Sequence, residues 1–317
     1  MGLEHGGVLT IGAVVAALVV AGCGGDDDGD ATTTAAPKAA APTTPAPAAH
    51  TTTTPPVAGT VRASAAVARA ATQLDKQKGV AVSTRGEVVT NGKTTTVKGK
   101  GAINRATGRG AFTITTVLSG TPIVVREVSD GRAVYFTGKV FANRLPGKRS
   151  WMKIDLVKAA EAEGFDPSTL GTNGPSQDPS QVLDYLKGAT TAKKVGTEEI
   201  RGVATTHYRF DADLDKAVAK SRSKLTKATL AKLQSTLGSA ETIPVDVWLD
   251  ARHRVLRERV RYTATIKGLS SALDFTTDFS DFGVPVKVDT PPASDTVDGL
   301  KLLEQANAAK QQQEQNG

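Results

Sequence analysis

Short segments of alternating apolar and polar residues, separated by tight turns, fill much of this chain after residue 79. Val80, Val82 and Val88 alternate with polar positions, and the pair Asn91-Gly92 follows them. Alternation with a period of two places successive side chains on opposite faces of a strand, and Asn-Gly favours a two-residue hairpin turn. The chain is therefore predicted to build an antiparallel sheet one hairpin at a time.

The same pattern predicts about ten or eleven strands in all. After the first, strands are expected over 94–103, 110–118, 122–128, 133–137, 194–200, 203–210, 243–249, 254–266 and 272–282. Further tight turns are expected at Thr107-Gly108, Asp130-Gly131 and Arg201-Gly202. A sheet of that size tends to curl or split rather than stay flat.

Helical patterns interrupt the strands and are expected to cover the apolar face of the sheet. Apolar residues recur every three or four positions over 61–78, ahead of the first strand, and over 213–237, the longest helical stretch. Shorter helices are expected over 155–163 and 179–186, with a Gly/Pro/Ser-rich loop over 166–178 between them. The predicted fold class is α+β, a large curved antiparallel sheet covered by inserted helices, with a loose tail from Pro291 onward.

The N-terminal region resembles the export signal of bacterial lipoproteins. Residues 11–22 carry no charge, and the segment Leu18 to Cys23 ends on Ala21, Gly22 and Cys23. Twelve residues are too few for a spanning helix, which needs about 20, but suit the apolar core of a signal peptide. In the lipobox that this segment resembles, the cysteine sulfur receives a diacylglyceryl group and a peptidase cuts before it. The alternative is an ordinary buried helix that contains a cysteine.

The residues after Cys23 favour a stalk rather than a fold. Ala, Thr and Pro occupy 26 of the 30 positions over 31–60, too little apolar surface to offset the entropy of ordering. The expected organisation is a signal peptide over 1–22, the lipidated Cys23 and a disordered stalk over 23–60, a folded domain over 61–297 and a loose tail over 298–317. Cys23 is the single cysteine, so a disulfide within the chain is excluded.

The charge of the chain gathers in its folded part. Residues 61–317 contain 38 of the 39 Lys and Arg residues and 27 of the 32 Asp and Glu residues. This part of the chain therefore carries a net charge of +11. A basic domain suits an anionic membrane surface, although general solubility explains it as well. Nucleic acid is not expected as a partner, because aromatic residues make up only 4% of the chain and an exported protein meets little of it.

Motifs for catalysis or for metal binding were not found. The folded part holds two histidines, His207 and His253, and neither lies in an HExxH arrangement or near a cysteine. No GxSxG motif occurs, and Gly99-Lys100-Gly101 is better explained by a strand and turn than by a phosphate loop. Asp246 and Asp250 are expected to be solvated. We therefore expect a non-enzymatic protein without cofactor or metal.

The lipobox and stalk are followed by Arg201–Tyr208, by Val245–Asp250 with Arg254–Arg257, and by Asp278–Gly283. Together these segments resemble the LolA-like lipoproteins, in particular the LppX/LprG branch of actinobacterial envelopes, which implies a LolA-like lipid-binding domain over 61–297. The resemblance implies a curved half-barrel, closed by helices, around an apolar cavity that holds acyl chains of a lipid or glycolipid. It also implies anchoring on the outer side of the cell membrane and transfer of the ligand to an envelope transporter or acceptor protein.

Alternation along the strands selects ten apolar side chains as candidates for the lining of this cavity. They are Phe112, Ile114, Leu118, Tyr135, Leu256, Val260, Tyr262, Leu273, Phe275 and Phe279. For any one of them, ordinary burial in a core is the simpler explanation, because apolar strand faces are normally buried. A second function stays open: an envelope sensor or regulatory lipoprotein that uses the same fold to bind a protein partner.

Overall fold

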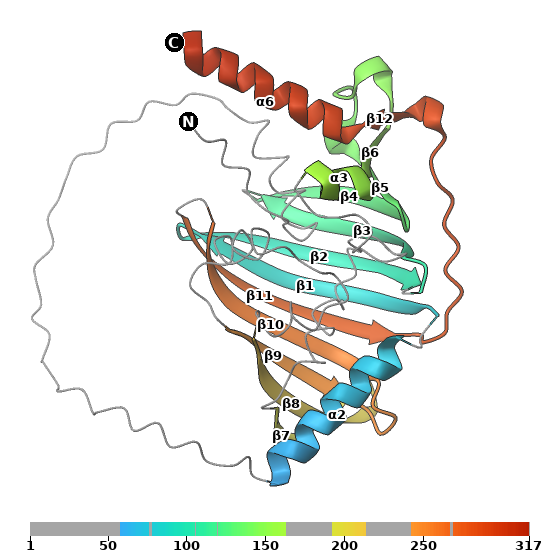
Figure 1. Cartoon of the computed structure of the whole chain (residues 1–317), viewed down its shortest axis with the longest axis vertical. Helices are drawn as coiled ribbons and strands as arrows, with labels where there is room; N and C mark the ends of the chain where they lie inside the picture. The colour runs from blue at the N-terminus through green and yellow to red at the C-terminus, as the bar shows by residue number, and fades with distance from the viewer. Residues whose placement is uncertain are drawn as a thin grey trace, which may run out of the picture.

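The structure is a computed structural model, and it describes residues 58–75, 78–104, 106–118, 120–162, 192–213, 242–266 and 269–316. Twelve strands form one sheet in the order β12-β6-β5-β4-β3-β2-β1-β11-β10-β9-β8-β7 (Figure 1). The order ends on β12 at one edge and β7 at the other, so the sheet is open. The large, curved, mainly antiparallel sheet that the sequence predicted is confirmed.

The first half of the sheet is a run of hairpins. Its strands are β1 (Val80–Thr90), β2 (Lys93–Asn104), β3 (Arg109–Leu118), β4 (Thr121–Asp130), β5 (Ala133–Thr137) and β6 (Trp151–Asp155). Asn91 and Gly92 both have positive φ, 50° and 73°, as a hairpin turn that matches the strand twist requires. Gly131, with φ 92°, is the turn residue that the sequence predicted between β4 and β5.

Of the remaining strands, β7 to β11 continue the sheet on the other side of β1, and β12 adds to the edge at β6. They are β7 (Lys193–Ile200), β8 (Val203–Asp213), β9 (Thr242–Leu249), β10 (Val255–Ile266), β11 (Leu269–Ser280) and β12 (Thr296–Asp298). β11 pairs with β1 along ten residues, and this pairing joins the second group of strands to the first. The hairpin predicted at Arg201-Gly202 is confirmed, and both turn residues have positive φ.

Among the described residues the helices are α2 (Ala58–Asp75), α3 (Leu156–Ala162) and α6 (Gly299–Asn316), with short 3-10 turns at Lys139–Phe141, Pro146–Lys148 and Ala293–Asp295. α2 lies across β7 to β10 in Figure 1. Ala63, Val67 and Ala70 of α2 are buried, and their small side chains let the helix approach the sheet closely. α3 begins where the sequence predicted, because the Asp155 carboxylate accepts the backbone N–H groups of Val157 and Lys158.

Three expectations differ from the structure or lie outside it. The strand count is twelve, because β6 and β12 were not predicted, and the pair they form is parallel. Where a loose tail was expected, the chain forms β12 and the helix α6, which Asp298 caps at its N-terminus. The loop over 166–178 and the helices over 179–186 and 213–237 lie outside the described residues, apart from Asp213 itself.

Candidate functional site

Register pairing divides the sheet into two faces, and one of them is apolar. Directly opposite residues of neighbouring strands share a face, so Phe112 shares its face with Gly101, Val82 and Phe279. We call this face, on which α2 packs, the inner face. Val82, Phe279 and Phe112 belong to the same hydrophobic cluster as Val67 of α2.

The structure brings most of the candidate residues together on the inner face. By register they are Phe112, Ile114, Leu118, Val260, Tyr262, Leu273, Phe275 and Phe279. Val260 and Phe279 are buried, whereas Phe112, Ile114, Tyr262, Leu273 and Phe275 are half-buried. The side chain of Leu118 lies outside the described residues. An apolar concave face with partly open aromatic and aliphatic side chains is the kind of surface that takes a hydrocarbon.

Two candidates lie on the opposite face, which we call the outer face. Tyr135 pairs with Val128 and Lys153, and it packs with Val288 of the segment that follows β11. Leu256 lies at an irregularity in the pairing of β10 with β9, and it packs with Ile200 and Trp248. Neither residue joins the other eight on the inner face.

Glycines shape the middle of the inner face. A Cβ atom added to Gly101 would overlap the carbonyl oxygen of Ala111 and the ring of Phe112, so this ring rests directly on the glycine. Phe275 rests on Gly86 in the same way. Aromatic rings that cover cross-strand glycines hold the register, and the glycines permit the strands to bend. The curvature that makes the inner face concave thus has a local cause in the sequence.

A buried carboxyl group lies within this apolar face and was not among the predicted site residues. Glu127 lies opposite Phe112 and Phe136, and its side chain is almost wholly buried. Burial raises the pKa of Glu127 to about 8, so the group is mostly neutral at pH 7. A protonated carboxyl is compatible with an apolar surface and can both donate and accept a hydrogen bond.

A polar cluster of β8, β9 and β10 lies on the outer face. Asp246 is buried rather than solvated, and its carboxylate accepts hydrogen bonds from His207, Arg209 and Arg261 at 2.7, 2.8 and 3.2 Å. Burial alone would raise the pKa of Asp246, but the hydrogen bonds of Arg209 and His207 outweigh it and lower the pKa.

An aromatic stack extends this cluster. The ring of His207 stacks on Trp248 at 4.2 Å, and the Trp248 indole N–H donates to Glu198. Asp250, also buried, accepts the backbone N–H groups of Arg252 and Arg254 and so fixes the turn between β9 and β10. Each of these acids has a partner within the fold, which favours a structural role for the cluster.

Removal of the Asp246 carboxylate should destabilise the fold. Asp246→Asn leaves His207, Arg209 and Arg261 without their shared anion, and we expect a loss of about 2 kcal/mol in the free energy of unfolding. The two arginines are half exposed, so water compensates part of the loss. Urea denaturation measures it, with Asp211→Asn, an exposed change on the neighbouring strand β8, as control. Equal stability of both variants would contradict the structural role of Asp246.

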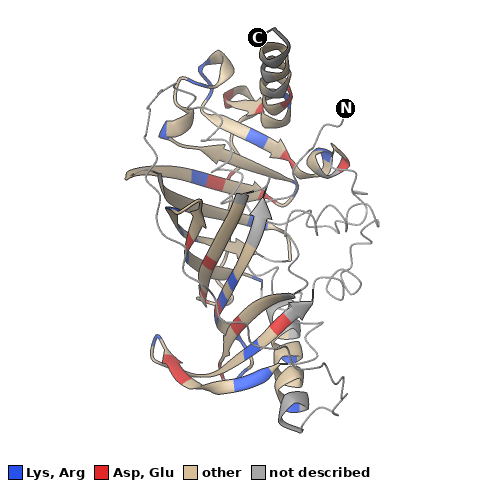
Figure 2. Cartoon of the chain, turned by 90° about the vertical axis from the view of Figure 1, so that its left-hand side faces the viewer, with Lys and Arg blue, Asp and Glu red and all other residues tan. Residues whose placement is uncertain are grey.

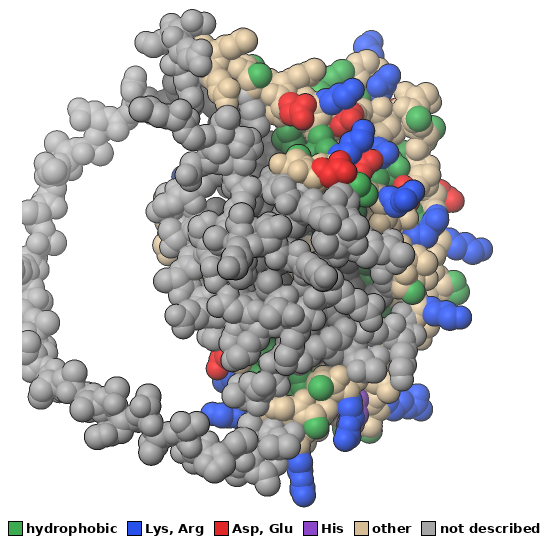
Figure 3. Space-filling model, viewed as in Figure 1, with side chains coloured by type: hydrophobic (Ala, Val, Ile, Leu, Met, Phe, Trp, Pro, Cys, Tyr) green, Lys and Arg blue, Asp and Glu red, His purple; other side chains and the backbone are tan. Residues whose placement is uncertain are grey.

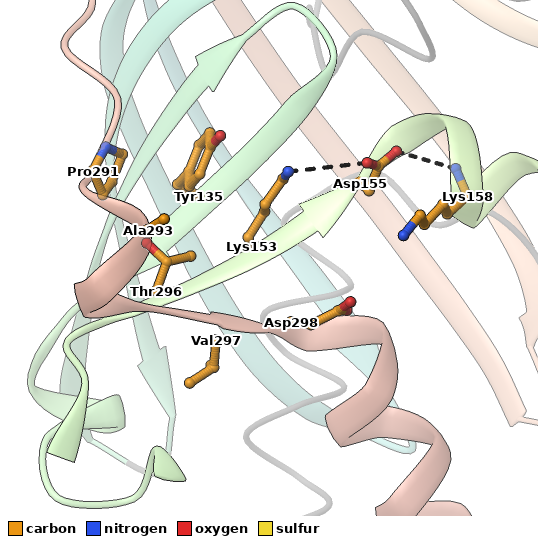
Figure 4. A pocket seen from close by; sticks show the side chains of 9 residues that line it. All are labelled: Tyr135, Lys153, Asp155, Lys158, Pro291, Ala293, Thr296, Val297 and Asp298. Carbon is orange, nitrogen blue, oxygen red and sulfur yellow. Dashed lines mark hydrogen bonds and ion pairs between the residues drawn. The ribbon is translucent and has the colours of Figure 1, made fainter. Parts of the chain in front are cut away.

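Two open pockets lined by described residues lie near the edges of the sheet, and the second includes the inner-face residues Thr206, Tyr208 and Leu249. One, of about 240 Å³, is lined by Tyr135, Lys153, Asp155, Lys158, Pro291, Ala293, Thr296, Val297 and Asp298 (Figure 4). Burial and the neighbouring Asp130 carboxylate raise the pKa of Tyr135 to about 12. The other, of about 440 Å³, lies beside the β7–β8 hairpin and includes Glu198, Thr206 and Asp250.

Within the described ranges there is no group of three or more His, Cys, Asp or Glu side chains that is arranged to hold a metal ion. In the same ranges no helix combines the length and apolar character needed to cross a membrane.

The chain is similar to proteins known from their sequences and to proteins of solved structure. No family model matches the chain. A Streptomyces coelicolor protein named as a putative lipoprotein is 29% identical over 166 residues, which is 52% of this chain and 48% of that protein. Among solved structures, the Mycobacterium tuberculosis lipoprotein LppX is 15% identical, with a TM-score of 0.42 over 72% of this chain and 98% of that chain. LppX belongs to the group that the sequence motifs resemble.

A longer match comes from Streptomyces griseus. The uncharacterised 31.2 kDa protein of the rplA–rplJ intergenic region is 30% identical to this chain over 249 residues. The match spans 74% of this chain and 80% of that protein. The chain therefore belongs to the family of this Streptomyces griseus protein.

Proposed function

We propose that the chain is a lipoprotein of the cell envelope that holds a lipid or glycolipid against its inner face and carries or presents it. Cys23 would carry the anchor on the outer side of the cell membrane, and the stalk over 24–60 would let the domain reach away from it. The proposal is supported by one observation above all. Five of the apolar candidates, Phe112, Ile114, Tyr262, Leu273 and Phe275, share one concave face and keep part of their surface open.

The physical basis of the proposal is the cost of exposing hydrocarbon to water. Each methylene group costs about 0.8 kcal/mol, so a long acyl chain moved through water without a carrier costs on the order of 10 kcal/mol. A concave apolar sheet lowers this cost by contact alone, and no nucleophile, base or metal takes part. The protein is therefore proposed to be non-enzymatic, with an acceptor or transporter of the envelope as its partner.

A charge placed on the inner face should greatly reduce lipid loading. Phe275→Arg replaces a half-buried ring with a cation, and we expect the affinity for lipid to fall by about thirtyfold, since burial of one aromatic side chain is worth about 2 kcal/mol. The lipid is measured by organic extraction and mass spectrometry of the full chain made in a lipid-rich actinobacterial host. Intact-mass spectra of the same preparation report acylation of Cys23.

The matched control is Thr113→Arg, an exposed change on the outer face of β3, beside Phe112. It should leave the lipid content unchanged, and circular dichroism should show that both variants are folded. If the unaltered protein releases no lipid, or if both arginine variants carry as much as it does, the carrier function is refuted.

The sensor function is favoured by a different observation. Val82, Val260 and Phe279 are buried against each other in the cluster that includes α2, so this part of the inner face is already filled by the protein itself. A filled interior suits a fold that binds a protein partner rather than a lipid. The extraction experiment separates the two functions, because a sensor of this kind would be purified without bound lipid.

A further inference from the structure

The outer face carries two adjacent rows of basic residues that no other part of the proposed function uses. Directly opposite positions across β2, β1, β11, β10, β9 and β8 form the first row, which is Lys98, Arg85, Thr276, Arg259, Asp246 and Arg209. The next row contains Lys100, Ser83, Asp278, Arg257, Trp248 and His207. We call Arg85, Lys98, Lys100, Arg209, Arg257 and Arg259 the cationic patch.

In these two rows the acidic side chains lie deeper than the basic side chains around them. The Asp246 and Asp278 side chains are only 3% and 12% exposed, whereas those of Arg85 and Arg209 are 54% and 49% exposed. Asp278 lies beneath Arg85 and Arg257, and Asp246 accepts from Arg209. The acids therefore position the arginines, and a partner approaching this face would meet mainly guanidinium and ammonium groups.

The arrangement also breaks a local rule of sheet design. Arg85 lies directly opposite Lys98, and like charges at directly opposite positions destabilise a sheet. Such a conflict within an otherwise consistent sheet is typical of a functional surface. The row on one side, with Glu87 and Asp274, is acidic and marks the boundary of the patch.

The shape of the patch indicates the kind of partner. With strands about 4.8 Å apart, a row across six strands extends about 24 Å. The two pockets described above do not involve the patch, and Val286 and Val288 cover the outer face near β3 to β5. A cationic surface that extends across six strands fits an extended anionic surface better than a small ligand. Figure 2 marks Lys and Arg positions along the strands, and Figure 3 shows basic side chains over one side of the molecule.

We propose that the cationic patch docks the domain onto a bilayer that contains anionic phospholipids. The guanidinium groups are suited to lipid phosphates, because their planar forks bind phosphate oxygens in pairs. This inference rests on the proposed membrane location, and it adds a second contact to the acyl anchor. The diacylglyceryl group supplies two acyl chains, which suffice for stable anchoring, so the patch would set how the folded domain lies on the bilayer.

The test is cosedimentation of the full chain, carrying Cys23→Ala so that no acyl anchor contributes, with lipid vesicles. Vesicles of phosphatidylglycerol mixed with phosphatidylcholine are compared with phosphatidylcholine alone, at low and high salt. The variant Arg85→Gln/Lys98→Gln/Lys100→Gln should bind the anionic vesicles more weakly by about tenfold or more. Each basic residue changes partitioning onto an anionic bilayer by up to about fivefold. High salt should remove the difference.

The control is Lys139→Gln/Arg144→Gln/Lys148→Gln, which removes the same charge from an exposed segment between β5 and β6. A fall of less than about twofold is expected for it, since these residues lie outside the patch. Equal losses in both variants would show attraction by net charge alone and overturn the proposal, as would equal binding to neutral vesicles. Loading of the inner face is read separately by lipid extraction, so docking can fail while the carrier function stands.

Discussion

Replacing Glu127 with glutamine should remove a large part of the stability that the fold loses as the pH rises. The pKa of Glu127 rises from 4.5 to about 8 on burial, so the folded protein retains a proton that the unfolded chain releases. Stability from this group is complete below pH 4.5 and is lost as the pH rises toward 8, by up to about 1.4 kcal/mol per pH unit. Between about pH 5.5 and about pH 8, the unaltered protein should lose about 3 kcal/mol relative to Glu127→Gln.

Urea denaturation across this pH range measures the difference between the two proteins. Comparing them at each pH cancels the other titrating groups. Glu87→Gln, an exposed change on the outer face of β1, should leave the pH dependence of stability as it is. If Glu127→Gln follows the same pH profile as the unaltered protein, water reaches the carboxyl group, and the inner face near Phe112 is not dry.

The second large effect is expected at Gly101. In Gly101→Ala the new methyl group overlaps the backbone carbonyl of Ala111 and the ring of Phe112, and backbone cannot move aside as a side chain can. We expect a loss of about 3 kcal/mol in the free energy of unfolding. Displacement of the Phe112 ring should also lower the lipid content of the purified protein.

Gly99 provides a matched control on the same strand and the same face. A Cβ atom there would have Thr84 as its nearest neighbour, with the Thr84 Cβ at an ordinary distance of 3.8 Å. Gly99→Ala should therefore be neutral or slightly stabilising, because alanine restricts the unfolded chain more than glycine does. Equal stability of the two alanine variants would show that the Gly101 site adapts, and the argument for a ring held on glycine would be wrong.

Local turn chemistry explains why so much of the fold could be predicted from the sequence. Asn91-Gly92, Asp130-Gly131 and Arg201-Gly202 each place residues of positive φ between alternating segments, and each is a hairpin turn in the structure. Asp155 caps α3 for an equally local reason. The unpredicted strands depend on partners far along the chain, because β12 has only three residues and pairs with β6.

The candidate residues on the inner face were predictable wherever alternation was strict, as in β3 and β11. In β5 every residue from Ala133 to Phe136 is buried, so the pattern could not tell which face Tyr135 occupies. At Leu256 the irregular pairing between Val255 and Arg257 shifts the alternation. The burial of Glu127 could not be predicted, because a carboxyl on an alternating strand is expected to be solvated. Its burial depends on the packing of the whole face.

The segment between β11 and β12 ties the middle of the sheet to one edge. Arg109 donates to the Val288 carbonyl, Ser150 N–H donates to Asp295, and Arg149 donates to the Thr296 carbonyl. At the opposite edge the described β7–β8 hairpin contacts β9, α2 and, through the Arg201 guanidinium, the Phe279 carbonyl of β11. Detaching the β12 edge would therefore require the three hydrogen bonds of the segment between β11 and β12 to break together with the β12–β6 pairing.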